Sequence, residues 1–211
     1  MSPVKALDAR SELAASDPVM ARLIDELGEL SVEARKRQRP AVDSFGALLR
    51  SIIGQQISTK AAATIHDRFL ALFDGRTPTP AELGALGIDP LRGVGLSGRK
   101  AEYVLDLAHH VETGELELDR LDQLSDDEVV AEISAVRGLG VWSAQMFLIF
   151  HLDREDVLPT GDLGIRKGAQ IAYELDDPPS PAELTELAEP WRPHRTLASI
   201  YLWGILHNTP G

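Results

Sequence analysis

Cysteine is absent from the 211-residue chain. Its absence excludes disulfide bonds, thiolate zinc sites, a cysteine nucleophile and cysteine-ligated iron–sulfur clusters. The six histidines show no HxxxH or HxH spacing, so no metal site built from their side chains is expected. We therefore expect no cofactor. The lack of cysteine is also typical of a protein in the reducing cytoplasm, which we expect as its location.

Long hydrophobic runs are also missing. No stretch of about 18 apolar residues occurs, which argues against a membrane-spanning helix. The N-terminal stretch MSPVKALDARSELAASD lacks the apolar segment of a secretory signal. We expect no membrane partner, and a chain with 44% hydrophobic residues is able to bury a proper core.

Basic residues are too few to balance the acidic ones. The 21 Lys and Arg stand against 33 Asp and Glu, which gives a formal net charge of −12. Because nucleic-acid-binding proteins usually carry a basic excess, this balance disfavours such a partner. Net charge says little about any single face, however, and the pairs Arg99-Lys100 and Arg166-Lys167 concentrate positive charge locally. The charge lowers the expectation of DNA binding without excluding it.

Strand patterns are scarce, whereas helix-start signals are frequent. Thr79, Ser125 and Ser180 each precede a glutamate by three residues, which is the spacing of a capping box. Segment 44–54 has helical periodicity. We predict an all-α monomer of about ten helices. It should form a single body over residues 1–211, with two lobes that flank a cleft and with the second lobe assembled from both chain ends.

The stretch VRGLGVWSAQ at 136–145 places two glycines one residue apart between two expected helices, 125–137 and 141–151. Glycine tolerates positive φ, and a turn of this kind at a helix N-terminus exposes N–H groups that hold a phosphate without a basic side chain. The alternative is a C-cap glycine in a tight corner that binds nothing. The turn by itself does not decide between the two.

Four further stretches accompany this turn. They are SIIGQQIS at 51–58, GLSGRKAEY at 95–103, DVLPTGDLGIRKG at 156–168 and WRPHRTLASIYLW at 191–203. In order and spacing they resemble the helix-hairpin-helix DNA glycosylases, specifically the compact all-helical members of the 3-methyladenine glycosylase II branch. The resemblance implies a monofunctional enzyme of base excision repair. Such an enzyme flips alkylated purines, including 3-methyladenine and 7-methylguanine, out of double-stranded DNA and hydrolyses their bond to deoxyribose.

The resemblance places the catalytic aspartate at Asp162, within PTGDLGIRKG. Cleavage of an N-glycosidic bond builds positive charge on the sugar, and a fixed carboxylate opposes that charge and orients the attacking water. The alternative is that Asp162 only caps the helix that begins at Leu163. The two roles are compatible, because helix N–H groups stabilise a carboxylate in its ionised form.

The resemblance also assigns a base pocket. Lyase members of the superfamily carry a lysine two residues after the second glycine, where this chain has Trp142, which is unable to form a Schiff base. Trp142 is then a wall of the pocket, Trp203 stacks on the extruded base, and Met146 lies one helical turn from Trp142 on the same face. The alternative for Trp203 and Met146 is simple packing in the core.

The family's DNA contacts map onto two loops. Gln55 and Gln56 occupy the GQQ position, where Gln56 would enter the gap that the flipped nucleotide leaves. The hairpin would hold the DNA backbone through Gly138, Leu139, Gly140, Val141 and Ser143. The family's hairpin often binds a monovalent cation through backbone carbonyls, here those of Ser134, Val136 and Leu139.

Two other interpretations stay open at the level of sequence. The first is a non-catalytic helix-hairpin-helix module that only binds DNA. The second is an acidic helical domain that binds another protein and has no role with DNA. The combination of Asp162 with both tryptophans favours the enzyme over the first alternative. A gel shift with abasic-site DNA would distinguish the second.

Overall fold

The computed structural model describes residues 3–36 and 43–208, and within these ranges it contains helices and no strands. The all-α prediction is confirmed. The thirteen α-helices and two 3₁₀ helices exceed the ten expected. The excess comes from short elements such as α3 (Val32–Lys36) and α7 (Ile88–Gly93), since five or six residues are too few to display a helical period.

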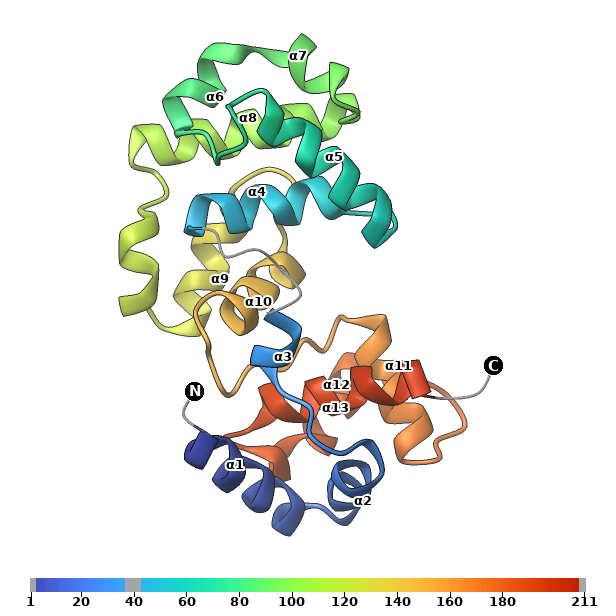
Figure 1. Ribbon diagram of the computed structural model, residues 1–211. Helices are drawn as coiled ribbons and strands as arrows, with labels where there is room; N and C mark the ends of the chain where they lie inside the picture. Colours follow the sequence, from blue (N-terminus) through green and yellow to red (C-terminus); the bar gives the residue numbers. More distant parts are fainter. Residues whose placement is uncertain (1–2, 37–42, 209–211) are drawn as a thin grey trace. The chain divides into compact units, whose positions relative to one another are not determined.

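The chain divides into two compact units, which are shown in Figure 1. Unit 2 is residues 41–147 and unit 1 combines residues 1–40 with 148–211, so unit 1 is built from both ends of the chain. The helices of unit 2 are α4 (Ser44–Gly54), α5 (Thr59–Ala71), α6 (Pro80–Leu86), α7, α8 (Gly98–Thr113), η1 (Leu118–Gln123), α9 (Asp126–Ala135) and most of α10 (Val141–Phe150). Those of unit 1 are α1 (Pro3–Ser16), α2 (Pro18–Leu27), α3, α11 (Leu163–Ala172), α12 (Pro181–Leu187), η2 (Glu189–Trp191) and α13 (Arg195–Asn208).

Helix starts follow the local sequence closely. The three expected capping boxes form at Thr79, Ser125 and Ser180, each with the hydroxyl and the glutamate bonded to backbone N–H groups in both directions. Helix α4 begins and ends where the periodicity of segment 44–54 predicts. Local side-chain chemistry therefore fixes these boundaries.

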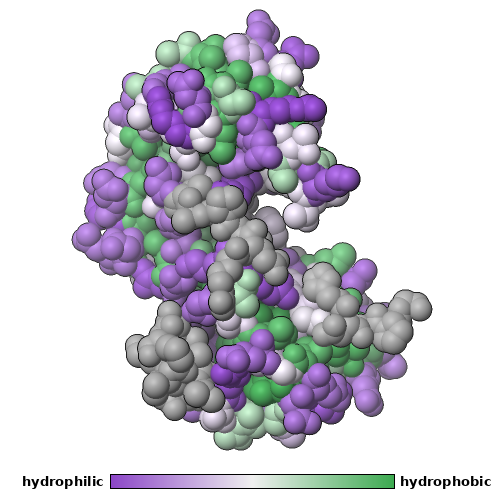
Figure 2. All heavy atoms as spheres, in the orientation of Figure 1, coloured by the Kyte–Doolittle hydropathy of each residue, from purple (hydrophilic) through white to green (hydrophobic). Residues whose placement is uncertain are grey.

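The surface mixes polar and apolar side chains. On the face that Figure 2 shows, hydrophilic and hydrophobic residues are interspersed, as expected of a chain in which charged residues make up 26%. In the described part of the chain, no helix has both the length and the apolar composition needed to cross a membrane.

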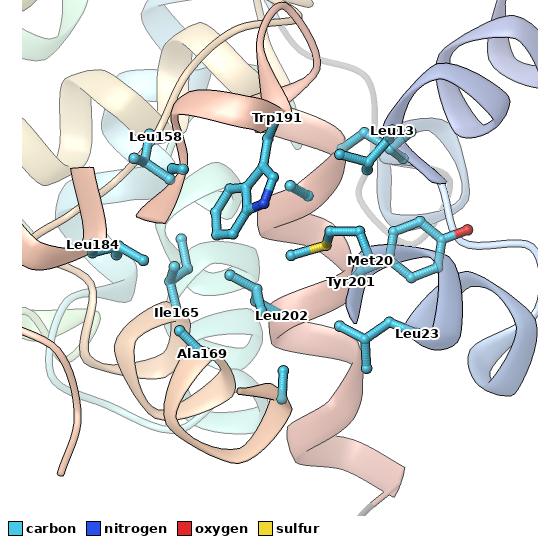
Figure 3. Packing of buried hydrophobic residues seen from close by; sticks show 14 of the residues in the cluster. Leu13, Met20, Leu23, Leu158, Ile165, Ala169, Leu184, Trp191, Tyr201 and Leu202 are labelled. Carbon is cyan, nitrogen blue, oxygen red and sulfur yellow. The ribbon is translucent and has the colours of Figure 1, made fainter. Parts of the chain in front are cut away.

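The core of unit 1 surrounds Trp191 and Tyr201, both fully buried. Figure 3 shows them among leucines of α1, α2, α12 and α13 and beside Leu158 of the loop before α11. Helices α11 and α13 pack side by side within this unit (Figure 1). A Cβ on Gly168 of α11 would collide with the backbone carbonyl of Leu202 in α13. Only glycine allows the two helices to approach so closely, and their contact holds the N-terminus of α11 against α13.

A buried carboxylate ties this core together. Asp17 is 7% exposed, and its Oδ2 accepts hydrogen bonds from Tyr173 Oη at 2.6 Å and Trp191 Nε1 at 2.9 Å. Its Oδ1 caps α2 by accepting from the N–H groups of Val19 and Met20. Each oxygen of the Asp17 carboxylate thus accepts two hydrogen bonds, which uses its acceptor capacity.

Candidate functional site

The hairpin between α9 and α10 is the tight turn that the two glycines predict. Gly138 has φ +85°, in the left-handed region, and a Cβ built on it would fall within the ring of Tyr103. Gly140 has no atom within 4 Å of its would-be Cβ, and it is exposed. Packing against Tyr103 therefore requires glycine at position 138. Packing does not require glycine at position 140, where a side chain would have room.

Helix α10 begins at an exposed end. Its first residues, Val141 and Trp142, are 55% and 46% exposed, whereas Leu139 and Ser143 are buried. The first N–H groups of an α-helix have no acceptor within the helix, so this end is open to an acceptor from outside. The geometry suits the phosphate-binding interpretation of Gly138 to Ser143, which remains a prediction.

The carbonyls predicted to hold a cation lie along the same hairpin. Val136 O accepts from Leu139 N at 3.1 Å, and Gly140 O accepts from Ala144 N at 3.1 Å. The hydroxyl oxygen of Ser134 is buried and has no hydrogen-bond partner among the described residues. No group of three or more acidic or histidine side chains that could hold a metal is found within residues 3–36 and 43–208. The carbonyl site of Ser134, Val136 and Leu139 stays a prediction.

The glutamine pair forms the turn that follows α4. Gln55 is half-buried, and its Nε2 donates to Gly138 O at 2.7 Å, which joins this turn to the hairpin 83 residues along the chain. Gln56 is exposed and has φ +55°, an unusual conformation for a residue with a side chain. The two neighbouring glutamines thus differ in role: Gln55 is an internal tie, and Gln56 projects to solvent.

Asp162 caps α11, as the local alternative predicts, and is also held by a residue far along the chain. Its Oδ1 accepts from Ile165 N at 2.9 Å and from Trp203 Nε1 at 3.0 Å. A Cβ on Gly164 would lie 2.9 Å from Asp162 Oδ1 and 3.2 Å from the Trp203 ring, so glycine leaves room for this contact. The carboxylate is therefore fixed in orientation from two directions.

The indole of Trp203 is half-buried and has two further neighbours in unit 1. Phe150 stacks against it, with ring centroids 6.2 Å apart and planes at 23°. The guanidinium carbon of Arg35 lies over the ring at 5.6 Å from its centroid. A cation over an indole face is attracted by the ring quadrupole, so the surroundings of Trp203 already accommodate positive charge.

Two other carboxylates, those of Asp153 and Asp156 in the loop between α10 and Asp162, have ion-pair partners. Asp156 contacts the guanidinium groups of Arg192 and Arg195, each at 2.7 Å, and Asp153 binds Lys36 Nζ at 2.7 Å. Asp156 is thus more firmly held than a solvated loop residue. Asp156 joins the loop to the start of α13 through these arginines. Asp162 is therefore the stronger candidate for the catalytic carboxylate.

The predicted residues fall into one group in each unit. Unit 1 brings together Asp162 and Trp203, and unit 2 brings together the Gln55 turn and the hairpin with Trp142. Met146 is half-buried one turn after Trp142, which fits either pocket or core. Sequence reasoning missed Arg35, Tyr103 and Lys100, whose contacts with these groups are long-range and leave no local signal.

The chain has clear similarity to known proteins. Residues 49–193 match the family described as HhH-GPD superfamily base excision DNA repair protein. The Bacillus subtilis protein YfjP is 30% identical over 165 residues, which are 75% of this chain and 58% of that protein, so this chain spans less than two thirds of its length.

Two solved structures are similar over nearly the whole chain. The 3-methyladenine DNA glycosylase Mag1 of Schizosaccharomyces pombe, in complex with abasic DNA, has a TM-score of 0.79 at 30% identity, covering 93% of this chain and 95% of its own. The DNA-3-methyladenine glycosidase of Bacillus halodurans has a TM-score of 0.82 at 32% identity, covering 96% and 88%.

Proposed function

Because the chain belongs to the HhH-GPD superfamily of base excision DNA repair proteins, we propose that it is a monofunctional DNA glycosylase that releases alkylated purines from duplex DNA. The observation that carries the proposal is the carboxylate of Asp162, held by the helix N–H of Ile165 and by the indole of Trp203. Relatives of similar fold bear the name of this activity, and one of them is bound to abasic DNA.

The proposed reaction needs little beyond such a carboxylate. As the base departs, the sugar acquires oxocarbenium character, and a preorganised negative charge stabilises it. Asp162 supplies that charge and orients the water that completes hydrolysis. Because two fixed N–H donors hold Oδ1, the carboxylate does not have to reorganise during the reaction.

The proposed substrates are purines that alkylation has made cationic. Arg35 over Trp203 illustrates the attraction between this indole and a positive charge, an effect of about 0.5–2 kcal/mol. A cationic base is also a good leaving group, so the site needs no strong general acid. In this proposal the flipped base takes the place of the Arg35 guanidinium over the Trp203 ring.

The hairpin accounts for how an acidic protein would hold DNA. Backbone N–H groups at the start of α10 neutralise phosphate without basic side chains, so a net charge of −12 is no obstacle. Flipping a nucleotide costs a few kcal/mol, and the hairpin with the Gln56 turn must offset it. We further propose that the protein acts as a monomer, with a monovalent cation on the hairpin carbonyls.

The lesion spectrum is the direct test of this function. In single-turnover assays on otherwise identical duplexes, we expect release of 3-methyladenine and 7-methylguanine, with weak or no release of 8-oxoguanine or uracil. Faster release of 8-oxoguanine than of 3-methyladenine would overturn the substrate assignment, and binding without release of any base would favour the non-catalytic module. A Met146→Tyr variant with an unchanged spectrum would reject only the pocket role of Met146.

Position 142 holds tryptophan in place of the lysine of the lyase members, and this predicts the form of the product. Because tryptophan has no amine to attack the sugar, the enzyme should leave an intact abasic site and should not nick the strand. Gel analysis of the product without alkaline treatment measures this. Borohydride trapping of a covalent adduct between protein and DNA would contradict it.

The two hairpin glycines are expected to respond differently to substitution. Gly138→Ala should lower the free energy of unfolding by about 2–4 kcal/mol, since it combines a strained positive φ with a clash against Tyr103. Gly140→Ala should leave stability within about 1 kcal/mol but weaken binding to damaged and undamaged duplex alike, because backbone contacts carry no sequence information. Thermal unfolding and DNA titrations measure both. Normal DNA affinity in folded Gly140→Ala would favour the ligand-free corner.

A further inference from the structure

Helix α8 carries three residues, spaced three apart, that reach the two loops of unit 2. Lys100 Nζ donates to Ile53 O at 2.8 Å and to Gln55 O at 2.6 Å. Tyr103 packs against Gly138 of the hairpin, and Asp106 Oδ2 accepts from Arg137 N at 2.9 Å. One face of a single helix thus supports both the glutamine turn and the hairpin.

Lys100 contacts the glutamine turn at two backbone carbonyls, one at the end of α4 and one directly before Gln56. Ile53 is in the last turn of α4, where carbonyl oxygens lack N–H donors within the helix, and an ammonium there also complements the helix dipole. Gln55 O belongs to the peptide group that joins Gln55 to Gln56. A hydrogen bond to it restrains the backbone immediately before the residue with φ +55°.

The conformation of Gln56 needs such support. A side chain in the left-handed region costs about 1–2 kcal/mol, so surrounding contacts must hold it. Lys100 holds the peptide from one side, and Gln55 Nε2 ties the turn to Gly138 O from another. Lys100 is half-buried, and this burial lowers the pKa of its ammonium group.

From these contacts we infer that Lys100 is a positioning residue, which locks the turn so that Gln56 is preorganised to fill the gap left by a flipped nucleotide. The inference rests on the proposed function for the role of Gln56. Its nearest competitor is a Lys100 that binds phosphate directly. In that case the residue would contribute to affinity and to its salt dependence, rather than to extrusion of the base.

The test compares Lys100→Met with Arg99→Met, which removes an adjacent, exposed cation from the same helix. The probe is a duplex with 3-methyladenine and a neighbouring 2-aminopurine, whose fluorescence rises when the stack opens. We expect Lys100→Met to reduce both the extrusion signal and single-turnover excision by about tenfold, because flipping is the step that the turn assists. A mispaired lesion costs less to extrude, so the loss of excision in Lys100→Met should be smaller on a duplex that carries one. Affinity for undamaged duplex should change no more than in Arg99→Met.

Combination with Gln56→Ala separates positioning from direct contact. If Lys100 acts through Gln56, the double variant should extrude no worse than Gln56→Ala alone, whereas the losses of two independent roles would add. Additive losses, or equal losses in Lys100→Met and Arg99→Met, would overturn the inference. Lys100→Arg keeps cationic donors and should retain more extrusion than Lys100→Met, and it replaces that variant if Lys100→Met does not fold.

The same experiment keeps the two proposals apart. Wild-type protein that extrudes the base without releasing it would reject the glycosylase, while the 2-aminopurine signal would still decide the role of Lys100. Wild-type protein that releases base normally, alongside Lys100→Met with unchanged extrusion, would reject only the positioning role. Wild-type protein that never opens the stack would overturn both.

Discussion

Asp162→Asn is expected to reduce single-turnover base excision at least ~10²-fold while leaving DNA affinity intact, as for the loss of other preorganised electrostatic groups. Asparagine is nearly the same shape, and its carbonyl oxygen still accepts from Ile165 N and Trp203 Nε1. The substitution therefore removes the negative charge that opposes the developing cation and little else. Stability should be almost unchanged, because asparagine caps a helix about as well as aspartate.

The matched control is Asp153→Asn, which removes an exposed carboxylate paired with Lys36. It should excise at the wild-type rate, because a surface ion pair contributes little. Rates are read from single turnovers on duplexes with 3-methyladenine, and affinity is read on abasic-site DNA. Wild-type excision in the Asp162→Asn variant would remove Asp162 from the mechanism and return attention to Asp156.

Asp17→Asn is expected to lower the free energy of unfolding by about 2–4 kcal/mol at neutral pH, with little change in how the folded protein binds DNA. The wild-type carboxylate accepts from both Tyr173 Oη and Trp191 Nε1 through one oxygen. In asparagine either the amide nitrogen opposes these donors or the cap of α2 is lost. The cost is large because Asp17 is buried and links chain segments more than 150 residues apart.

The pH dependence of this contribution has a definite sign. Burial by itself would raise the pKa of Asp17, but hydrogen bonds from Tyr173, Trp191 and the first turn of α2 outweigh it and lower the pKa below its usual value. A carboxyl whose pKa is lower in the folded state stabilises the protein above its unfolded pKa, near 4. That stability is lost as the pH falls through the folded value. The gap between wild type and Asp17→Asn should therefore narrow below about pH 4.

Asp43→Asn supplies the control for this stability test. Asp43 also caps a helix, accepting from Gly46 N at 2.7 Å, but it is exposed. Its substitution should change the free energy of unfolding by only a few tenths of a kcal/mol. Chemical denaturation at pH 7 and at pH 3–4 measures both variants. Equal effects at the two sites would show that Asp17 acts only as a cap.

The sequence by itself determined the helical class and most helix starts. A capping box or a helical period is complete within a few residues, so a short stretch of sequence is enough to predict it. This holds for the capping boxes at Thr79, Ser125 and Ser180 and for the period of α4. For the same reason Asp162 could be recognised as a helix cap from its local sequence. Its assignment as a catalytic group came only from resemblance to a family.

Only the tertiary structure decided what surrounds these residues. The bond from Trp203 to Asp162 spans 41 residues and that from Gln55 to Gly138 spans 83. Neither could be predicted, since each depends on how closely whole helices approach. The same holds for Gly138, whose local role as a turn glycine was evident but whose contact with Tyr103 was not. Periodicity and capping encode where a helix begins and which face is apolar. The distance and angle at which two helices pack depend on all the side chains between them, and this sets the positions of the functional groups.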